Sequence, residues 1–278
     1  MGANRDRFIW SKRMKITFIG AGNMSEAIIA GVLKQEVVAA DAVTVSDPLE
    51  ERRKHMQQAY GIHTEKDNAR AVVHADVVVL AVKPQVFPQV WGSLQSALAP
   101  SSLVVSIMAG VTSETIAGGS DLRVVRVMPN TPSLVGRGAS GIAQGASATE
   151  SDMEITERLM QAVGVSVRVD ENQLHAVTAL SGSGPAYLFY LMEAMVDSAK
   201  ELGLDEATAR LLCVETVGGA ADLLATSEDT PVELRKRVTS KGGTTAAAIK
   251  TFDERHLKEV VSAAMKSAFA RSKELASE

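Results

Sequence analysis

The sequence predicts an α/β fold in which a doubly wound parallel sheet is followed by an all-α C-terminal domain. Up to Val169, short uninterrupted runs of Val, Ile and Leu alternate with helical segments. From Leu174 onward, apolar residues recur at helical spacing and no strand-like run appears. The length of 278 residues favours two domains, at about 150 residues per domain.

Composition narrows the class of protein. With 46% hydrophobic and 22% charged residues, the chain resembles a soluble globular protein rather than a disordered, collagen-like or membrane-spanning one. A net charge of −4 supplies no broad positive field for nucleic acid or an acidic membrane surface. A single cysteine, Cys213, forms no intrachain disulfide, and no N-terminal apolar run suits a signal peptide. We therefore expect a cytoplasmic protein.

The N-terminal elements follow in order. Residues 1–13 are polar and basic, and we expect a frayed extension or an expression remnant there. Unbroken apolar strands indicate a sheet covered on both faces, because a strand with one wet face would alternate. Strands are predicted at Ile16–Ile19, Val43–Ser46, Val77–Val82, Leu103–Ile107, Val124–Val127 and, more weakly, Val165–Val169, with helices at Ser25–Gln35 and Leu49–Tyr60.

The boundary between the two domains is predicted near Glu171, giving residues 14–172 and residues 173–278. Helices in the second domain are predicted at Tyr187–Leu202, Asp205–Thr226, Pro231–Thr239, Thr244–Phe252 and Arg255–Leu275. Several are rich in Ala, Met and Leu, so we expect part of their apolar surface to be buried against another subunit. A compact monomeric bundle is the alternative.

A glycine-rich turn directly follows the first strand and opens the first helix. Its two glycines, Gly20 and Gly22, allow a tight turn and a close approach of the backbone to a pyrophosphate. Ser25 replaces the third glycine of the fingerprint, but a second strand ends at Asp47 at the expected distance. The pattern predicts a Rossmann-type dinucleotide site, and a glycine turn without a ligand is the alternative.

Signals for the choice of cofactor conflict. Asp47 lies where a carboxylate would accept hydrogen bonds from an adenosine ribose and repel a 2′-phosphate. Arg52 and Arg53, one turn further on, could bind such a phosphate. Asp47 with Pro48 is also an ordinary helix start, with a capping side chain and proline at the first helical position.

Two further loops follow strands and should reach the same crevice. Ala81-Val82-Lys83-Pro84 and Met128-Pro129-Asn130-Thr131-Pro132 each end an apolar run. In an open parallel sheet the carboxyl ends of the strands line the ligand crevice, and Lys83 would face anionic groups there. Surface connections with solvated side chains are the alternative.

The helical domain holds two glycine-rich segments that a bundle does not need for packing: Leu180–Tyr187 and Val238–Thr245. The second offers backbone amides and hydroxyls at a helix N-terminus, an arrangement suited to a carboxylate. Simple capping of the helix that begins near Thr244 is the alternative. The five histidines show no ligand spacing, so no metal site is expected, and His175 is interpreted as a structural histidine.

Together these motifs resemble the pyrroline-5-carboxylate reductase family, which catalyses the last step of proline synthesis. The resemblance runs from Met14 to Leu275. Its most specific part is the Thr239–Thr245 loop, where many members have proline in place of Lys241. The resemblance implies reduction of 1-pyrroline-5-carboxylate to L-proline by NADPH, with NADH as an open alternative, in a homodimer or larger homo-oligomer formed through the helical domain.

The resemblance also implies roles for particular residues. The cofactor would contact Ile19, Gly20, Ala21, Gly22, Asn23, Met24, Asp47, Asn68, Ala81, Val82, Lys83, Pro84, Ile107, Met108 and Ala109. The substrate carboxylate would meet the amides of Gly243, Thr244 and Thr245, with Ser240 in the same loop and Glu228 nearby. The Thr245 hydroxyl would be the catalytic group, hydrogen-bonded to the ring nitrogen.

Two rival functions stay open. A reductase of another imine or of β-hydroxyacids would place a lysine general acid in a long helix of the second domain, and Lys200 is a poor candidate near its helix end. A non-catalytic nucleotide-sensing protein would keep the Gly20 turn but has no use for the Ser240–Thr245 loop.

Overall fold

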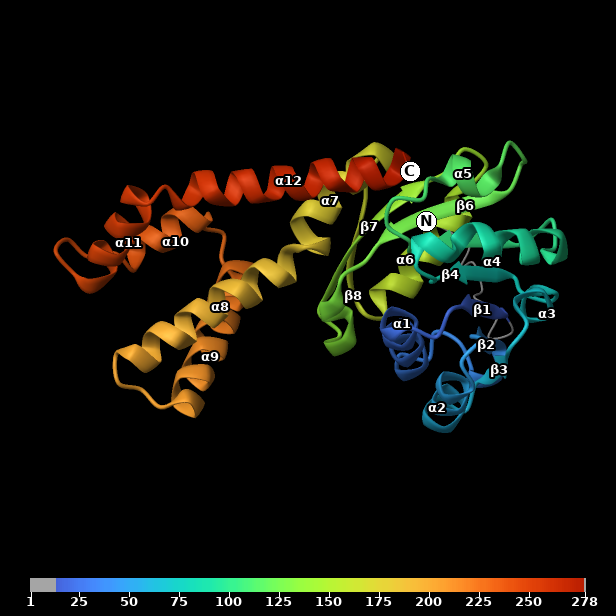
Figure 1. Cartoon of the computed structure of the whole chain (residues 1–278), viewed down its shortest axis with the longest axis horizontal. Coiled ribbons are helices and arrows are strands. Elements are labelled where there is room, and N and C mark those ends of the chain that lie inside the picture. The colour runs from blue at the N-terminus through green and yellow to red at the C-terminus, as the bar shows by residue number, and fades with distance from the viewer. Residues whose placement is uncertain (1–13, 278) are drawn as a thin grey trace, which may run out of the picture. The chain divides into compact units, whose positions relative to one another are not determined.

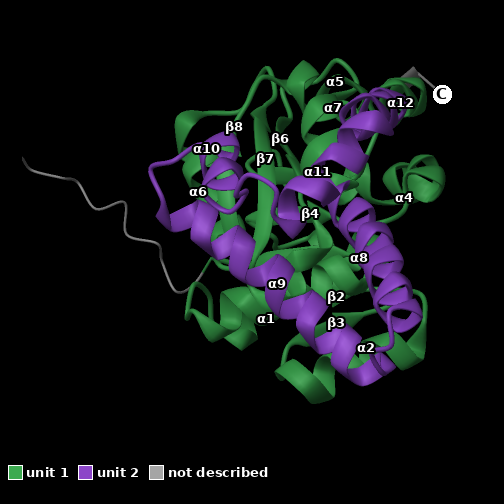
Figure 2. Cartoon of the chain, turned by 90° about the vertical axis from the view of Figure 1, so that its left-hand side faces the viewer, with its two compact units in different colours: residues 1–183, 268–278 green, residues 184–267 purple. Residues whose placement is uncertain are grey.

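The computed structural model describes residues 14–277, so the predicted N-terminal extension, residues 1–13, lies outside the described part. The chain divides into two compact units, one of residues 1–183 with 268–278 and one of residues 184–267 (Figure 2).

The first unit is built on a sheet of eight strands over the described residues, in the order β3-β2-β1-β4-β5-β6-β7-β8 (Figure 1). Their bounds are β1 Ile16–Ile19, β2 Val43–Ser46, β3 His63–Glu65, β4 Val77–Leu80, β5 Leu103–Ser106, β6 Arg123–Met128, β7 Gly138–Gln144 and β8 Gly164–Arg168. Pairing is parallel except between β6 and β7. The predicted doubly wound α/β fold is therefore confirmed, and two strands at one edge of the sheet, β7 and β8, run antiparallel to the other six.

Helices cover both faces of this sheet, and a separate apolar core lies on each face. The helices are α1 Asn23–Lys34, α2 Glu50–Tyr60, α3 Asn68–Val72, α4 Phe87–Leu94, α5 Ser113–Ala117 and α6 Glu150–Gln161. Phe18 and Val79 pack in a cluster with residues of α1, α2 and α6, whereas Val78 and Leu80 pack with residues of α3, α4 and α5. Neighbouring residues of one strand thus enter opposite cores, which explains the unbroken apolar runs.

Two strands were not predicted, β3 and β7. Strand β3 is a short, polar edge strand, and β7 has the sequence Gly-Ala-Ser-Gly-Ile-Ala-Gln. A Cβ on Gly141 would lie 2.9 Å from the methyl groups of Val177, and one on Gly138 would lie 2.8 Å from the carbonyl oxygen of Val163. Close packing therefore selects small residues in β7 and removes the Val/Ile pattern that marks the other strands.

The second unit is helical throughout. Its helices are α8 Gly184–Glu201, α9 Glu206–Thr226, α10 Pro231–Arg237, α11 Thr244–Glu254 and most of α12 Leu257–Ser277, whose residues from Ala268 belong to the first unit. All five helices of the second domain were predicted within a few residues. Many of their large apolar side chains are exposed, including Phe189, Leu211 and Val260. In residues 14–277, no helix is both long and apolar enough to cross a bilayer.

Asp152 at the start of α6 provides a test of the first unit's packing. Its side chain is 1% exposed and pairs with Arg123 at 2.7 Å. Its second oxygen accepts from the amide and hydroxyl of Thr149, both at 2.8 Å, which caps the helix. We predict that Asp152→Ala lowers the free energy of unfolding by about 3 kcal/mol, because it removes the cap and the partner of Arg123 together.

Urea denaturation would measure this change, with Glu154→Ala as the matched control on the exposed face of the same helix. The control should stay within about 0.5 kcal/mol of wild type. Equal free energies of unfolding for the two variants would contradict the prediction.

Candidate functional site

The glycine turn lies between β1 and α1, and its geometry requires glycine at the first position. Gly20 has φ 102°, and a Cβ there would lie 2.9 Å from the carbonyl oxygen of Ala81. Gly22 is the N-cap of α1, and no side chain caps the helix. A Cβ on Gly22 would have no atom within 4 Å, so space is open directly above the helix N-terminus. Free amides beside open space can bind an anionic group.

Ser25, which replaces the third glycine of the fingerprint, stabilises the turn through a hydrogen bond. Its side chain is buried, and its hydroxyl donates to the carbonyl oxygen of Gly20 at 2.6 Å. The substitution therefore adds a hydrogen bond within the turn and leaves the outer face of the helix N-terminus free.

Two residues after β2 hold the turn through Ala21. The amide of Ala21 donates to Oδ2 of Asp47 at 2.8 Å. The guanidinium of Arg52 donates from Nε and Nη2 to the carbonyl oxygen of Ala21, at 2.8 and 2.6 Å. Both polar backbone groups of Ala21 are thus fixed by side chains from the neighbouring strand-helix unit. Asp47 lies at the turn itself, where a ribose acceptor is expected.

The alternative interpretation of Asp47-Pro48 as a helix start is wrong. Helix α2 begins at Glu50 with Leu49 as its N-cap, so Pro48 lies before the helix. Asp47 Oδ1 does accept from the amide of Leu49 at 2.9 Å. This hydrogen bond forms a side-chain turn that lies before the helix and does not cap it. Arg53 donates to the carbonyl oxygens of Asp47 and Pro48 at 2.7 and 2.9 Å.

Glu26 on α1 fixes Arg52 in turn. Its carboxylate accepts from Arg52 at 2.7 Å, from Tyr60 at 3.0 Å, and lies 2.6 Å from Nε2 of His55. Burial raises the pKa of Glu26, but the hydrogen bonds from His55, Arg52 and Tyr60 outweigh burial and lower this pKa to about 2. Glu26 therefore stays ionised, and Arg52 is held in place with its charge partly neutralised.

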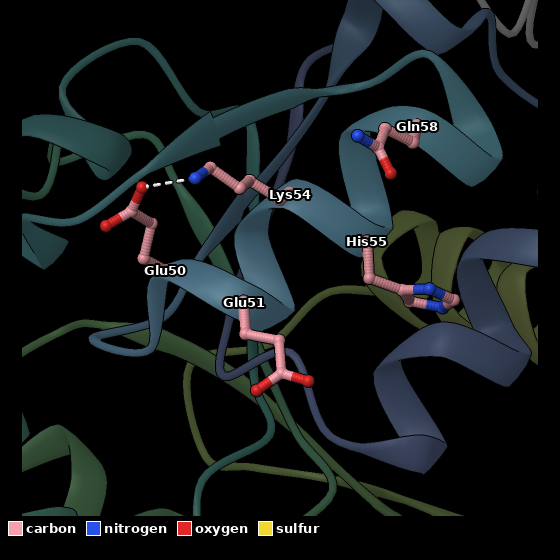
Figure 3. A pocket seen from close by; sticks show the side chains of 5 residues that line it. All are labelled: Glu50, Glu51, Lys54, His55 and Gln58. Carbon is pink, nitrogen blue, oxygen red and sulfur yellow. Dashed lines mark ion pairs between the residues drawn. The ribbon is translucent and has the colours of Figure 1, made fainter.

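The outer surface of α2 carries a shallow hollow that does not contribute to this site. It has a volume of about 510 Å³ and is lined by Glu50, Glu51, Lys54, His55 and Gln58 (Figure 3). Lys54 points toward Glu50, with which it pairs at 2.7 Å, and His55 points away from that pair (Figure 3). All of the lining residues come from one helix, so no groups from different elements converge there.

Other predicted cofactor residues are brought to the same edge of the sheet. The amide of Ala81 donates to the carbonyl oxygen of Ile19 at 3.0 Å, and that of Ile107 donates to Leu80 at 3.1 Å. Asn68, the first residue of α3, accepts from the hydroxyl of Ser46 at 2.7 Å. Lys83 is exposed just before the 3-10 turn Pro84–Val86. The predicted residues after β1, β2, β4 and β5 therefore lie along one edge.

Sequence reasoning missed a buried ion pair next to the Ile107–Ala109 segment. Arg126 on β6 is 5% exposed and contacts Glu171 at 3.2 Å and the carbonyl oxygen of Met108 at 3.4 Å. Burial lowers the pKa of Arg126, whereas the charge of Glu171 raises it. Glu171 also accepts from the amide of Ser113 at 2.8 Å. An arginine within the apolar run Arg-Val-Val-Arg-Val-Met was the signal available in the sequence.

His175 lies close to this pair and makes the contacts of a structural histidine. Its Nδ1 lies 3.0 Å from the hydroxyl of Ser272, and its ring packs edge-on against Phe269. Burial lowers the pKa of His175, and the positive charges of Arg126 and Lys273 lower it further. Among residues 14–277 no cluster of three His, Cys, Asp or Glu side chains has the geometry of a metal site.

In the second unit, the Ser240–Thr245 loop ends at a helix N-terminus without a side-chain cap. Gly243 is the N-cap of α11, and its amide donates to the carbonyl oxygen of Ser240 at 3.1 Å. Gly242 has φ 73°, a conformation that favours glycine. Helix α11 begins at Thr244, as both interpretations of the loop predict, and the alternative of simple helix capping stays open. Lys241 is exposed.

Thr244 and Thr245 are the first two residues of α11, with Thr244 exposed and Thr245 half-buried. Glu228 is exposed between α9 and α10. Within the described part of the chain, Glu228 shows no hydrogen bond to the Ser240–Thr245 loop. Of the three amides predicted to bind an anion, that of Gly243 is bonded within the loop, whereas Thr244 and Thr245 lie at a helix N-terminus without a side-chain cap. Their binding of a carboxylate and a role of Glu228 in orienting the loop stay predictions.

Comparison with known proteins matches both halves of the chain. A family model described as NADP oxidoreductase, coenzyme F420-dependent, matches residues 15–110, and one described as pyrroline-5-carboxylate reductase dimerisation matches residues 171–275. A pyrroline-5-carboxylate reductase of Pseudomonas aeruginosa is 46% identical over 265 residues, which cover 94% of this chain and 97% of that protein.

Solved structures agree with the sequence comparison. A pyrroline-5-carboxylate reductase from Coxiella burnetii has a TM-score of 0.88 and 40% identity, covering 95% of this chain and 98% of that one. A pyrroline carboxylate reductase from Plasmodium falciparum, solved with NADP bound, has a TM-score of 0.87 and 25% identity over 95% of this chain and 99% of its own. With similarity of this extent across both units, the chain belongs to the pyrroline-5-carboxylate reductase family.

Proposed function

We propose that this protein reduces 1-pyrroline-5-carboxylate to L-proline, the last step of proline biosynthesis, with NADPH as the hydride donor and NADH as a second donor. The observation that carries the proposal is 46% identity to a pyrroline-5-carboxylate reductase over 94% of the chain. The match includes the residues of both the glycine turn and the Ser240–Thr245 loop. A nicotinamide cofactor and a small cyclic imine with a carboxylate are thus the ligands.

The residues of the first unit fit a dinucleotide. The uncapped N-terminus of α1 and the open space above Gly22 suit the pyrophosphate, whose negative charge the free amides stabilise. Asp47 is placed to accept from a ribose, and the Ala81–Pro84 and Ile107–Ala109 segments follow along the same edge. When bound, the reduced cofactor supplies a hydride to the imine carbon.

The residues of the second unit fit the two polar groups of the substrate. Amides of Thr244 and Thr245 suit the carboxylate, since the first turn of α11 leaves them without a side-chain acceptor. The amide of Gly243 already donates to the carbonyl oxygen of Ser240 at 3.1 Å, so it would have to exchange that bond to take part. The Thr245 hydroxyl hydrogen-bonds the ring nitrogen. A neutral imine needs one proton at this nitrogen in addition to the hydride at the carbon, whereas an imine protonated beforehand needs only the hydride. Because a protonated imine is already electrophilic, alignment of the reacting atoms is the main requirement.

Residues 14–172 serve the cofactor in this proposal, and residues 173–278 serve dimerisation and substrate binding. Exposed apolar side chains on α9 and α12, such as Leu211 and Val260, support burial against a second copy. The family model for dimerisation over residues 171–275 supports a homo-oligomer, a dimer or larger. We further propose that the protein works in the cytoplasm and binds no nucleic acid.

One observation weighs against a β-hydroxyacid reductase. Lys200 lies in the last turn of α8 and is paired with Glu206 at 3.3 Å and with Asp197 at 4.0 Å. A lysine in surface ion pairs at a helix end is poorly suited to donate a proton to a bound substrate.

A steady-state assay tests the proposed function. We predict that the protein oxidises NADPH, and NADH more slowly or at a similar rate, only when 1-pyrroline-5-carboxylate is added. Proline formation should match cofactor oxidation mole for mole. Cofactor binding without turnover would indicate a nucleotide-sensing protein. Turnover of the carbonyl compound that corresponds to a β-hydroxyacid, with no turnover of 1-pyrroline-5-carboxylate, would indicate the other reductase class.

We predict that Asp47→Ser shifts the ratio of kcat/KM values toward NADPH by about tenfold. Removal of one negative charge near the 2′-position relieves repulsion of about 1 kcal/mol, while Arg52 remains fixed by Glu26 and Ala21. Asp41→Ser, at an exposed site on the 3-10 turn Ala40–Ala42, controls for net charge. A shift toward NADH, or none, would remove Asp47 from the ribose site.

We predict that Thr245→Ala lowers kcat/KM for the imine by about 10²-fold or more, because it removes the hydroxyl at the ring nitrogen. NADPH affinity should stay within about twofold. Thr245→Ser keeps the hydroxyl and should retain much of the activity, and Thr244→Ala should be milder because its amide remains.

Thr251→Ala is the matched control, since Thr251 is an exposed threonine on the same helix whose hydroxyl donates to the carbonyl oxygen of Ala247. Steady-state kinetics of all four variants would measure the effect. Wild-type rates in both Thr245→Ala and Thr244→Ala would exclude the loop as the substrate site.

A further inference from the structure

A π turn interrupts the helix that leads out of the first unit. Helix α7, Leu174–Val177, is followed by π-helical residues Thr178–Gly182 and then by α8. The amide of Ser183 donates to the carbonyl oxygen of Thr178 at 2.8 Å, five residues back. Such widened turns are rare and occur frequently at functional sites. This turn overlaps the Leu180–Tyr187 segment at residues 180–182, and the proposed function gives that segment no role.

The side-chain amide of Asn130 makes two hydrogen bonds, one to the π turn and one to the start of β7. Its Nδ2 donates to the carbonyl oxygen of Ser181 at 3.0 Å, and its Oδ1 accepts from the amide of Ala139 at 2.9 Å. The side chain is buried, since Asn130 is only 8% exposed. It therefore links the loop after β6, the start of β7 and the π turn, and an unmade bond at such a depth is costly.

The π turn also packs against the end of β6. A Cβ on Gly182 would lie 2.7 Å from Cε of Met128, which is the free end of a flexible side chain and can move aside. Met128 is the last residue of β6, two positions before Asn130. The turn therefore contacts the strand end that precedes Asn130, and the hydrogen bond from Asn130 is the interaction that fixes its position.

That strand end lies beside a segment expected to contact the cofactor. Strands β5 and β6 are parallel, with Ser106 opposite Arg126. Two residues further along, Met108 follows β5 and Met128 ends β6, and Arg126 contacts the carbonyl oxygen of Met108. The π turn is therefore fixed at the carboxyl edge of the sheet, next to the Ile107–Ala109 segment.

We propose that Asn130 is a positioning residue for the reduction, which holds the π turn so that its backbone forms a fixed wall beside the reacting carbon. The inference rests on the proposed function. Misplacement of reacting atoms by about 1 Å can cost about 10²-fold in rate. The pyrophosphate and adenosine contacts lie after β1, β2 and β4, so loss of this wall should change turnover and leave cofactor affinity intact.

Asn130→Asp tests the proposal, because it exchanges only the donor. The carboxylate still accepts from the amide of Ala139 but repels the carbonyl oxygen of Ser181. We predict a fall in kcat of about 10- to 100-fold, an unchanged Kd for NADPH and faster hydrogen exchange at the amides of residues 181–183. Asn172→Asp, at an exposed position on the 3-10 turn Glu171–Gln173, makes the same chemical change as a control and should behave as wild type.

A second variant keeps the test decisive if Asn130→Asp does not fold. Asn130→Ala removes both hydrogen bonds without burying a charge and should lower kcat in the same way. Wild-type kcat in Asn130→Asp, or in Asn130→Ala when only that variant folds, overturns the proposal. A matching loss of NADPH affinity also overturns it, because it indicates general damage. A wild-type protein inactive on 1-pyrroline-5-carboxylate would instead overturn the proposed function.

Discussion

The parallel register of the central strands is the constraint on which the site depends. Ile19 is opposite both Ser46 and Leu80, and Leu80 is opposite Ser106. Four strands therefore end at one level, and the chain leaves each of them at the same edge. The turn at Gly20, Asp47, Ala81 and Ile107 all begin directly after these ends. Backbone hydrogen bonding between the strands thus places the four loops close together, so that residues from all of them can contact one ligand.

Electrostatic interactions then fix the details of that edge. Glu26 interacts with three side chains, and Arg52 also donates from Nε and Nη2 to the carbonyl oxygen of Ala21. In the sequence, Asp47 and Arg52 stand as opposed signals for two cofactors. In the structure they cooperate, one on the amide and one on the carbonyl group of the same residue. Arg52 thus fixes the conformation of the turn.

Sequence patterns predicted the strands that are buried on both faces of the sheet. They missed strands that are short or that require glycine because a neighbouring element packs closely against them. Strands β1 and β2 and the start of α11 agree with the predicted bounds because apolar runs, glycine and threonine mark them directly. Strand β7 was missed because contacts with Val163 and Val177 require glycine where a valine would signal a strand. The Arg126–Glu171 pair and the bridge made by Asn130 were missed because partners 45 and 51 residues apart leave no local pattern.

The division of α12 between the two units bears on how the protein is made. The first unit needs residues from Ala268 onward, where Ser272 reaches His175 and the backbone of Leu275 would lie 2.9 Å from a Cβ on Gly110. During synthesis the N-terminal sheet leaves the ribosome first, but the last segment that packs on it is translated after the whole helical unit. The surface around His175 and Gly110 stays uncovered until the residues of α12 from Ala268 onward have been made. The loop that follows Ile107–Ala109 is therefore covered later than the sheet from which it extends.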